Sequence, residues 1–152
     1  MTQGILLGTH LDTGDPFYIS NQRLATKKGF LIGQSEAGKT WAAAVAVEGM
    51  MDLGITVIVF DLIDMWSGLA LDFEGKRQAY PIAIFGGKRG HYRLTPDIGN
   101  AIARTVYSKR WSTVINLSGM VEKDQFRIAA DVVRKTMQLH EDQPRRTVFV
   151  FE

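Results

Sequence analysis

The stretch Gly33-Gln34-Ser35-Glu36-Ala37-Gly38-Lys39-Thr40 decides how the rest of this sequence is read. It matches the phosphate-binding pattern G-x-x-x-x-G-K-[ST] at every fixed position. The short apolar run at residues 29–32 precedes it and predicts a buried strand, and the Ala-rich run at residues 41–51 follows it and predicts a helix. A strand, a glycine-containing loop and a helix in this order bring the amino end of the helix to a bound phosphate. The stretch therefore predicts a nucleotide site.

The residue types in this loop each have a physical role. Gly33 and Gly38 let the backbone turn sharply and approach a polyphosphate. Lys39 is expected to reach the β- and γ-phosphates, and the hydroxyl of Thr40 is expected to ligate Mg²⁺. Glu36 stands where many such loops carry glycine, so its charge has to point away from the phosphates. The expected nucleotide-binding residues are Gly33, Gln34, Ser35, Glu36, Ala37, Gly38, Lys39, Thr40 and Trp41.

Composition limits the class of protein. With 152 residues, the chain is long enough for one domain with a proper core, and 45% hydrophobic and 22% charged residues are typical of a globular α/β protein. The absence of cysteine excludes a disulfide framework and a thiolate metal site. The longest apolar run, residues 41–53, is interrupted by Glu48 and Asp52 and is too short to span a bilayer. The first residues lack the pattern of a signal peptide. These features predict a cytoplasmic protein without a membrane partner.

Charge is unevenly distributed along the chain. The formal net charge is +2, but residues 104–146 hold nine Lys and Arg against five Asp and Glu, a local net of +4, which leaves −2 for the remainder. A basic sector of this kind is compatible with contact to a nucleic-acid backbone. It is equally the composition of a solvated helix face, and both interpretations stay open.

The remaining chain alternates predicted strands and helices. Residues 4–8 and 17–19 predict two strands, and the turn-forming residues 12–16 between them predict a hairpin. Further strands are predicted at residues 55–60, 81–85, 112–118 and 147–151, and helices at residues 96–107 and 123–140. The last helix has an apolar stripe that we expect to face the core: Phe126, Ala129, Ala130, Val133 and Met137.

Carboxylates end two of the predicted strands. Asp61 follows the strand at residues 55–60, at the edge where open parallel sheets bind ligands, with Asp64 close behind. These two could orient water around Mg²⁺ or contact a neighbouring subunit, or they could cap a turn before a helix at residues 65–71. Glu152 closes the last strand, where nucleoside triphosphatases place the carboxylate that holds Mg²⁺ through water. A strand that stops at this carboxylate leads us to expect that the sequence is part of a longer protein.

Over nearly its whole length the sequence resembles the HerA-like ATPases of the HerA–FtsK superfamily. The phosphate-binding loop and the segment Tyr80-Pro81-Ile82-Ala83-Ile84-Phe85-Gly86-Gly87 are the most specific parts of the resemblance. The other features that fit are Gly14-Asp15-Pro16 in the hairpin, the strand ending in Asp61 with Trp66 shortly after, the strand at residues 114–118 and the closing acidic strand.

The resemblance implies an α/β fold: a three-layer RecA-like P-loop NTPase core with a mostly parallel sheet, preceded by an N-terminal β-hairpin. Residues 1–28 would be the hairpin and its connection, and residues 29–152 the ATPase core, cut at the second, acidic motif. The implied activity is hydrolysis of ATP by a hexameric ring that moves along double-stranded DNA, often beside a nuclease. ATP and Mg²⁺ are the implied cofactors. Lys39 and Glu152 take the catalytic positions, and Thr40 and Glu152 hold the metal.

The sequence departs from the family at several positions. Glu152 stands where the family usually has Asp, Asn116 also replaces an Asp, and Glu36 replaces a Gly. The glutamate that polarises the attacking water normally comes just after the position of Glu152 and is not in this chain. Arg145 and Arg146 are weak candidates for an arginine finger.

A second function stays open on these residues. The chain could be a regulatory module that uses ATP as an assembly switch and never translocates DNA; Glu36, Asn116 and the modest net charge favour this alternative. A small-molecule kinase is disfavoured, because the sequence has no lid-like arginine cluster and no acidic pattern for an acceptor site.

Overall fold

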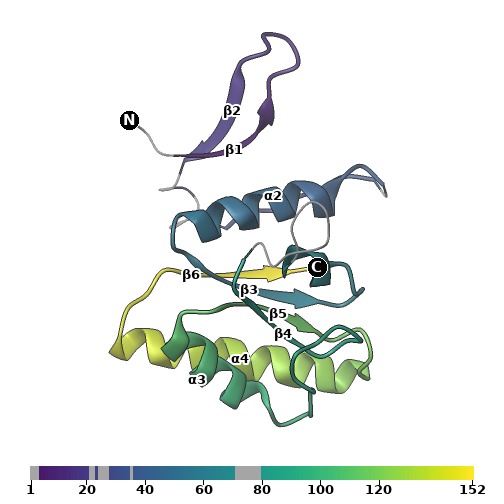
Figure 1. Cartoon of the computed structure of the whole chain (residues 1–152), viewed down its shortest axis with the longest axis vertical. Helices are drawn as coiled ribbons and strands as arrows, with labels where there is room; N and C mark the ends of the chain where they lie inside the picture. The colour runs from purple at the N-terminus through teal and green to yellow at the C-terminus, as the bar shows by residue number, and fades with distance from the viewer. Residues whose placement is uncertain (1–3, 21–22, 24–27, 35, 71–79) are drawn as a thin grey trace. The chain divides into compact units, whose positions relative to one another are not determined.

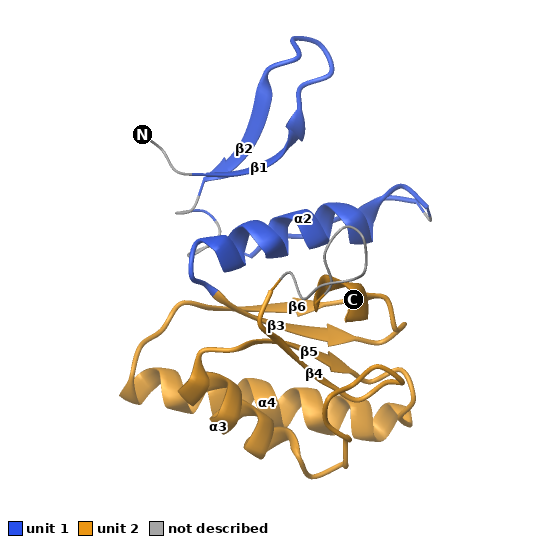
Figure 2. Cartoon of the chain, in the orientation of Figure 1, with its two compact units in different colours: residues 1–55 blue, residues 56–152 orange. Residues whose placement is uncertain are grey.

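The computed structural model describes residues 4–20, 23, 28–34, 36–70 and 80–152. The chain divides into two compact units, residues 1–55 and residues 56–152, coloured blue and orange in Figure 2. The boundary expected from the sequence, after residue 28, separates a hairpin from an ATPase core and stays a prediction.

The first unit begins with the predicted hairpin. β1 (Gly4–Thr9) and β2 (Pro16–Ser20) pair antiparallel in a two-stranded sheet (Figure 1). The turn is closed by the amide of His10, which donates to the carbonyl of Asp15 at 2.8 Å. Turn-forming residues between two apolar runs produce this geometry, and the hairpin is confirmed.

The predicted helix after the loop is also confirmed. α2 (Lys39–Asp52) begins directly after Gly38, and its Ala-rich sequence has high helix propensity. Ile5 of β1 is buried and contacts α2 at Gly49, so the hairpin and α2 pack together within the first unit.

The prediction of a strand at residues 29–32 is wrong. None of these residues is in a strand, and the side chains of Phe30 and Ile32 are 84% and 94% exposed. A short apolar run becomes a strand only where a neighbouring strand completes its hydrogen bonds. Neither sheet among the described residues includes this run. Its composition therefore indicates strand propensity, but the described part of the chain supplies no strand that pairs with it.

The second unit is built on a parallel sheet. Its strands are β3 (Thr56–Asp61), β4 (Ile82–Phe85), β5 (Ser112–Asn116) and β6 (Thr147–Phe151), in the spatial order β4-β5-β3-β6 (Figure 1). All neighbouring pairs are parallel. β3 is buried at all six positions, as its continuous β-branched run predicts for a central strand. The four strands predicted from the sequence are confirmed.

Two helices cover one face of this sheet. α3 (Gly99–Lys109) and α4 (Glu122–Asp142) lie on the same side of it (Figure 1). Gly99 lets them approach closely, because a Cβ atom there would be only 2.8 Å from the Cβ of Asp131 and 2.9 Å from the carbonyl oxygen of Ile128. The core between helices and sheet consists of Ile58, Phe60, Ala83, Phe85, Ile102, Ala103, Val106, Ile115, Leu117, Ile128 and Val132.

The prediction of which face of α4 is buried is mostly wrong. Phe126, Ala130 and Met137 are exposed, whereas the buried positions are Ile128, Val132 and Thr136. Ala129 and Val133 are partly buried and pack at the edge of the core. The helix carries two apolar stripes, and helical spacing alone does not choose between them. The close approach of α3 at Gly99 selects the stripe that includes Ile128.

A short 3₁₀ helix, η1 (Trp66–Ala70), follows β3 and contacts β4 and β5. It stands where the sequence allowed a helix at residues 65–71. The described residues thus form an α/β fold with a four-stranded parallel sheet and helices packed on it. Among the described helices, none has the length and apolar character needed to cross a membrane.

Candidate nucleotide-binding site

Among its described residues, the loop that matches the phosphate-binding pattern contains two residues in the left-handed conformation, Glu36 and Gly38. The amide of Ala37 donates to the carbonyl of Gln34 at 3.3 Å, which closes a turn, and Gly38 then adopts φ 79° as α2 begins. Glu36 adopts φ 64°, a conformation that costs a side-chain-bearing residue about 1 kcal/mol. Ser35 lies outside the described residues. The expected loop residue Gly33 has the side chains of Ala37 and Lys39 within 3.5 Å of where its Cβ would be.

Lys39 folds back over this loop. It is the first residue of α2, and its Nζ donates to the carbonyl oxygen of Gln34 at 2.6 Å. Lys39 and Thr40 are both partly buried. The first turn of α2 holds no acidic residue, and Gly38 provides no side-chain cap, so the positive end of the helix dipole is not offset by a carboxylate of that turn. An ammonium group and a helix amino end next to one loop fit a polyphosphate.

Trp41 follows Thr40 directly in the first turn of α2. Its side chain is 77% exposed. A flat aromatic side chain beside a phosphate-binding loop can stack on a ring, and an exposed indole changes its fluorescence when it is covered. In a variant whose other two tryptophans, Trp66 and Trp111, are replaced by Phe, the fluorescence of Trp41 would report on binding at this loop.

A second group of polar residues lies at the carboxyl edge of the sheet in the second unit. Asp61 pairs with Asn116 in the β3–β5 register, and Phe60 pairs with Phe151 in the β3–β6 register. Glu152 follows Phe151, so the same register places it beside Asp61. The amide of Glu152 donates to the carbonyl of Phe60 at 3.3 Å, which continues the ladder. Asn116, Asp61 and Glu152 therefore stand in a row across three strands.

Asp61 caps the turn that leads into η1. It is fully buried, and its Oδ1 accepts hydrogen bonds from the amides of Ile63 at 3.1 Å and Met65 at 3.3 Å, while Oδ2 accepts one from the amide of Trp66 at 2.9 Å. Three backbone donors satisfy a buried carboxylate. Of the two interpretations left open by the sequence, this geometry supports the turn cap.

Both polar atoms of the Asn116 side-chain amide are hydrogen-bonded. Its Oδ1 accepts from the amide of Ser118 at 3.1 Å and from the hydroxyl of Ser118 at 2.7 Å, and its Nδ2 donates to Oδ1 of Asp64. The loop after β4 approaches this amide so closely that a Cβ on Gly87 would be 2.6 Å from Nδ2. A Cβ on Gly86 would be 2.3 Å from the carbonyl oxygen of Asn116, so neither of these two positions has room for a side chain.

Glu152 is half-buried, and its carboxylate accepts a hydrogen bond from an unexpected donor. The indole Nε1 of Trp66 donates to Oε2 of Glu152. The sequence places Trp66 shortly after Asp61 but carries no signal that Trp66 contacts Glu152.

The Arg145 side chain makes contacts within the second unit. One guanidinium nitrogen donates to the carbonyl of Tyr107, another to Oε1 of Gln143 at 3.2 Å, and the guanidinium carbon lies 5.0 Å from the centre of the Tyr107 ring. Arg145 precedes β6, at the opposite end of that strand from Glu152. These contacts give it a structural role in joining α3 to the start of β6.

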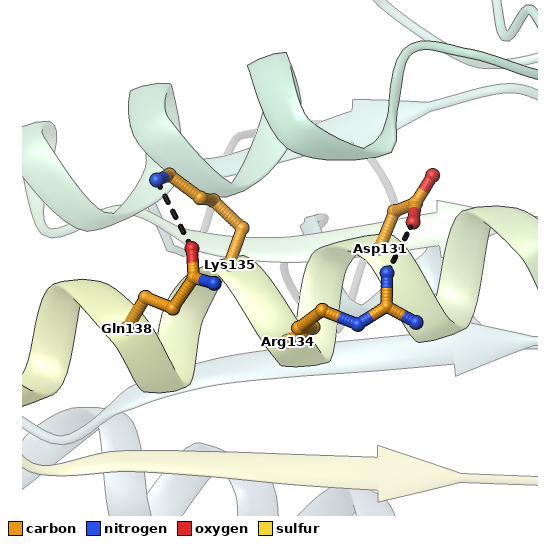
Figure 3. A network of polar contacts seen from close by, with 4 residues as sticks. All are labelled: Asp131, Arg134, Lys135 and Gln138. Carbon is orange, nitrogen blue, oxygen red and sulfur yellow. Dashed lines mark hydrogen bonds and ion pairs between the residues drawn. The ribbon is translucent and has the colours of Figure 1, made fainter.

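Two cations of the basic sector are engaged by contacts within α4. Arg134 pairs with Asp131 at 3.1 Å, and Lys135 donates to Oε1 of Gln138 at 3.2 Å (Figure 3). Arg104, Lys109, Arg110, Lys123 and Arg127 are exposed. The sector therefore keeps several exposed cations on α3, α4 and the residue after α3.

The residues predicted from the sequence fall into two groups: the loop and α2 in the first unit, and Glu152 with Asp61 and Asn116 in the second. Within the described parts of the chain, no cluster of three or more acidic or histidine side chains could hold a metal ion alone. Comparison with models of protein families, with curated proteins and with solved structures gives no match for this chain. Function is therefore inferred from the chain's own residues.

Proposed function

We propose that this chain is the ATP-binding core of a P-loop ATPase of the HerA-like kind, which hydrolyses ATP to move duplex DNA through an oligomeric ring. The observation that carries ATP binding is the position of Lys39, at the first turn of α2 with its Nζ on the loop carbonyl of Gln34. The three-layer RecA-like arrangement, the hexamer and a nuclease partner belong to the proposal through the family resemblance.

The roles of the loop residues follow from their chemistry. The ammonium of Lys39 offsets the charge of the β- and γ-phosphates, and the amino end of α2 adds its dipole. In this proposal the hydroxyl of Thr40 is a magnesium ligand, and the carboxylate of Glu152 has the role of holding metal-bound water. Bound Mg²⁺ would supply positive charge at the phosphate oxygens. The loop backbone fixes the position of the phosphates.

The test is the affinity for Mg²⁺-ATP, measured by calorimetry. Lys39→Ala is expected to weaken binding by about 10- to 100-fold, because a hydrogen bond to a charged group contributes about 1.5–3 kcal/mol. Lys109→Ala is the matched control, since Lys109 is an exposed lysine at the end of α3. An unchanged affinity in the Lys39 variant would sink the assignment.

The alternative, an ATP-dependent assembly switch, is favoured by one observation. Both ends of the Asn116 amide are engaged by Ser118 and Asp64, where the family usually has an Asp. A switch of this kind would bind ATP through the same loop but would not bind DNA. Affinity for duplex DNA, and its dependence on salt, separates the two proposals.

A further inference from the structure

The loop that follows β4 in the second unit is strongly basic. Lys88, Arg89 and Arg93 are all exposed, and residues 86–96 include no Asp or Glu. None of these three cations makes an ion pair with another residue that the structure describes. Three such cations in a stretch without acids attract the phosphate backbone of a nucleic acid.

Backbone hydrogen bonds close this loop at its base. The amide of Gly86 donates to the carbonyl of Tyr92 at 2.8 Å, and the amide of His91 donates to the carbonyl of Ile84 at 2.8 Å. The Nδ1 atom of His91 accepts a further hydrogen bond from the amide of Ile84 at 3.2 Å. A Cβ on Gly90 would overlap the carbonyl oxygen of Gly86, so the two sides of the loop lie in contact. A surface on such a loop is ordered before a ligand arrives, which lowers the entropy cost of binding.

Tyr92 adds an aromatic ring to the surface of this loop. Its ring stacks on the buried ring of Phe85, with the two centroids 5.0 Å apart and the planes 26° apart. Phe85 therefore covers one face of the Tyr92 ring, and Tyr92 is still 48% exposed. An exposed ring with cations beside it is the arrangement on which the bases of single-stranded nucleic acid stack. A duplex offers such a ring little, because its bases already stack on one another.

We propose that residues 86–93 bind single-stranded nucleic acid, with one base stacked on Tyr92 and the adjoining phosphates held by Lys88, Arg89 and Arg93. Stacking and phosphate contacts do not read the base sequence, so this site accepts single strands of different sequence. The inference goes beyond the proposed function, which concerns duplex DNA. It uses residues of the second unit alone, and it stands whether or not the chain binds ATP.

The first test is the affinity of the whole chain for a fluorescently labelled oligothymidine, measured by anisotropy and compared with a blunt duplex of the same length. Tyr92→Leu is expected to weaken binding of the single strand about tenfold, because the stacked base loses its ring, and to leave the duplex affinity unchanged. Tyr92→Phe keeps the ring and is expected to keep the wild-type affinity. Tyr18→Leu is the matched control, because Tyr18 is an exposed tyrosine of β2.

A second pair of variants tests the cations. Arg89→Gln with Arg93→Gln is expected to lower the slope of log affinity against log salt by about 1.4, because each phosphate contact on a single strand adds about 0.7. Arg134→Gln with Lys135→Gln removes the same charge from side chains that are already engaged within α4 (Figure 3). This control is expected to leave the slope unchanged. A slope that falls equally in both double variants would overturn the site, because it would reflect net charge alone.

Photo-crosslinking of the wild type tests the stacking contact even if a Tyr92 variant does not fold. An oligothymidine that carries 5-iodouracil forms covalent bonds on irradiation with aromatic rings that lie against the base. Mass spectrometry then locates the bond in the chain. Tyr92 is the expected position, and crosslinks that form only at other residues would overturn the inference.

The remaining outcomes separate this inference from the proposed function. A folded Tyr92→Leu variant that binds the single strand as tightly as the wild type overturns the inference. A variant that loses single-strand and duplex affinity equally also overturns it, because Tyr92 then supports the loop without stacking on a base. A wild type that binds ATP but no oligothymidine overturns the inference alone. A wild type that binds oligothymidine but no ATP overturns the proposed function alone.

Discussion

Glu36 is a position where one side chain opposes the chemistry of its loop. It carries a negative charge and adopts φ 64°, which favours glycine. We expect Glu36→Gln to raise ATP affinity about threefold, because an exposed charge interacts with its surroundings by up to about 1 kcal/mol. Glu36→Gly is expected to raise it further, since glycine adopts this conformation without strain. Calorimetric titration with Mg²⁺-ATP measures both changes.

The two variants divide the effect of Glu36 into charge and backbone. Glutamine removes the charge and keeps the left-handed residue, whereas glycine removes both. Equal ATP affinities in the two variants would mean that the backbone conformation at Glu36 does not affect binding. An ATP affinity below that of the wild type in both variants would mean that Glu36 itself contacts the ligand.

The sequence predicts which residues stand at the candidate site better than it predicts the role of each residue. Lys39 and Thr40 are placed by the motif and lie at the start of α2 as expected. The role of Asp61 depends on where the amides of the next five residues point, and spacing does not contain that information. Trp66 was missed for the same reason, because its contact with Glu152 joins residues 86 positions apart.

Among the elements, the packing of α3 on α4 depends on Gly99. A Cβ at this position would meet the backbone oxygen of Ile128 at 2.9 Å, and backbone gives way less easily than a flexible side chain. Gly99→Ala is therefore expected to lower the free energy of unfolding by about 1–3 kcal/mol, as overpacking does. Urea unfolding followed by circular dichroism measures the loss.

The matched control for this prediction is Gly119→Ala. A Cβ on Gly119 would have no atom within 4 Å, so the substitution is expected to leave stability within about 0.5 kcal/mol of wild type. If Gly99→Ala unfolds like Gly119→Ala, the helices do not pack as closely as described, and the choice of buried face on α4 needs another cause.

Element prediction succeeds where local sequence suffices. The four parallel strands of the second unit are runs of β-branched residues between turn signals, and each was predicted close to its observed bounds. Residues 29–32 and the buried face of α4 were not predicted correctly. Both depend on which neighbour is present: a strand needs a pairing partner, and a helix with two apolar stripes buries the one its neighbour meets.

At the scale of the whole molecule, the open question is whether the basic sector binds DNA. Its cations differ in how far they are engaged: Arg134 pairs with Asp131, and Arg145 is held by Tyr107, whereas Arg104 and Lys109 are exposed on α3. A cation that is already paired has less to gain from a phosphate. Under the translocase proposal, we therefore expect the exposed cations to contact the DNA phosphates before the paired ones do.

We expect the chain to bind duplex DNA with an affinity that falls steeply as salt rises, because each phosphate contact releases a counterion and adds about 0.9 to the slope of log affinity against log salt. The double variant Arg104→Gln with Lys109→Gln is expected to lower that slope by about 2, and Arg134→Gln by much less. Fluorescence anisotropy of a labelled duplex across a salt series measures all three.

A steep slope that the double variant leaves unchanged would place the DNA contacts outside α3. No DNA binding by a wild type that binds ATP would favour the switch, because ATP binding needs only the loop at Lys39, whereas translocation needs a surface that holds the duplex.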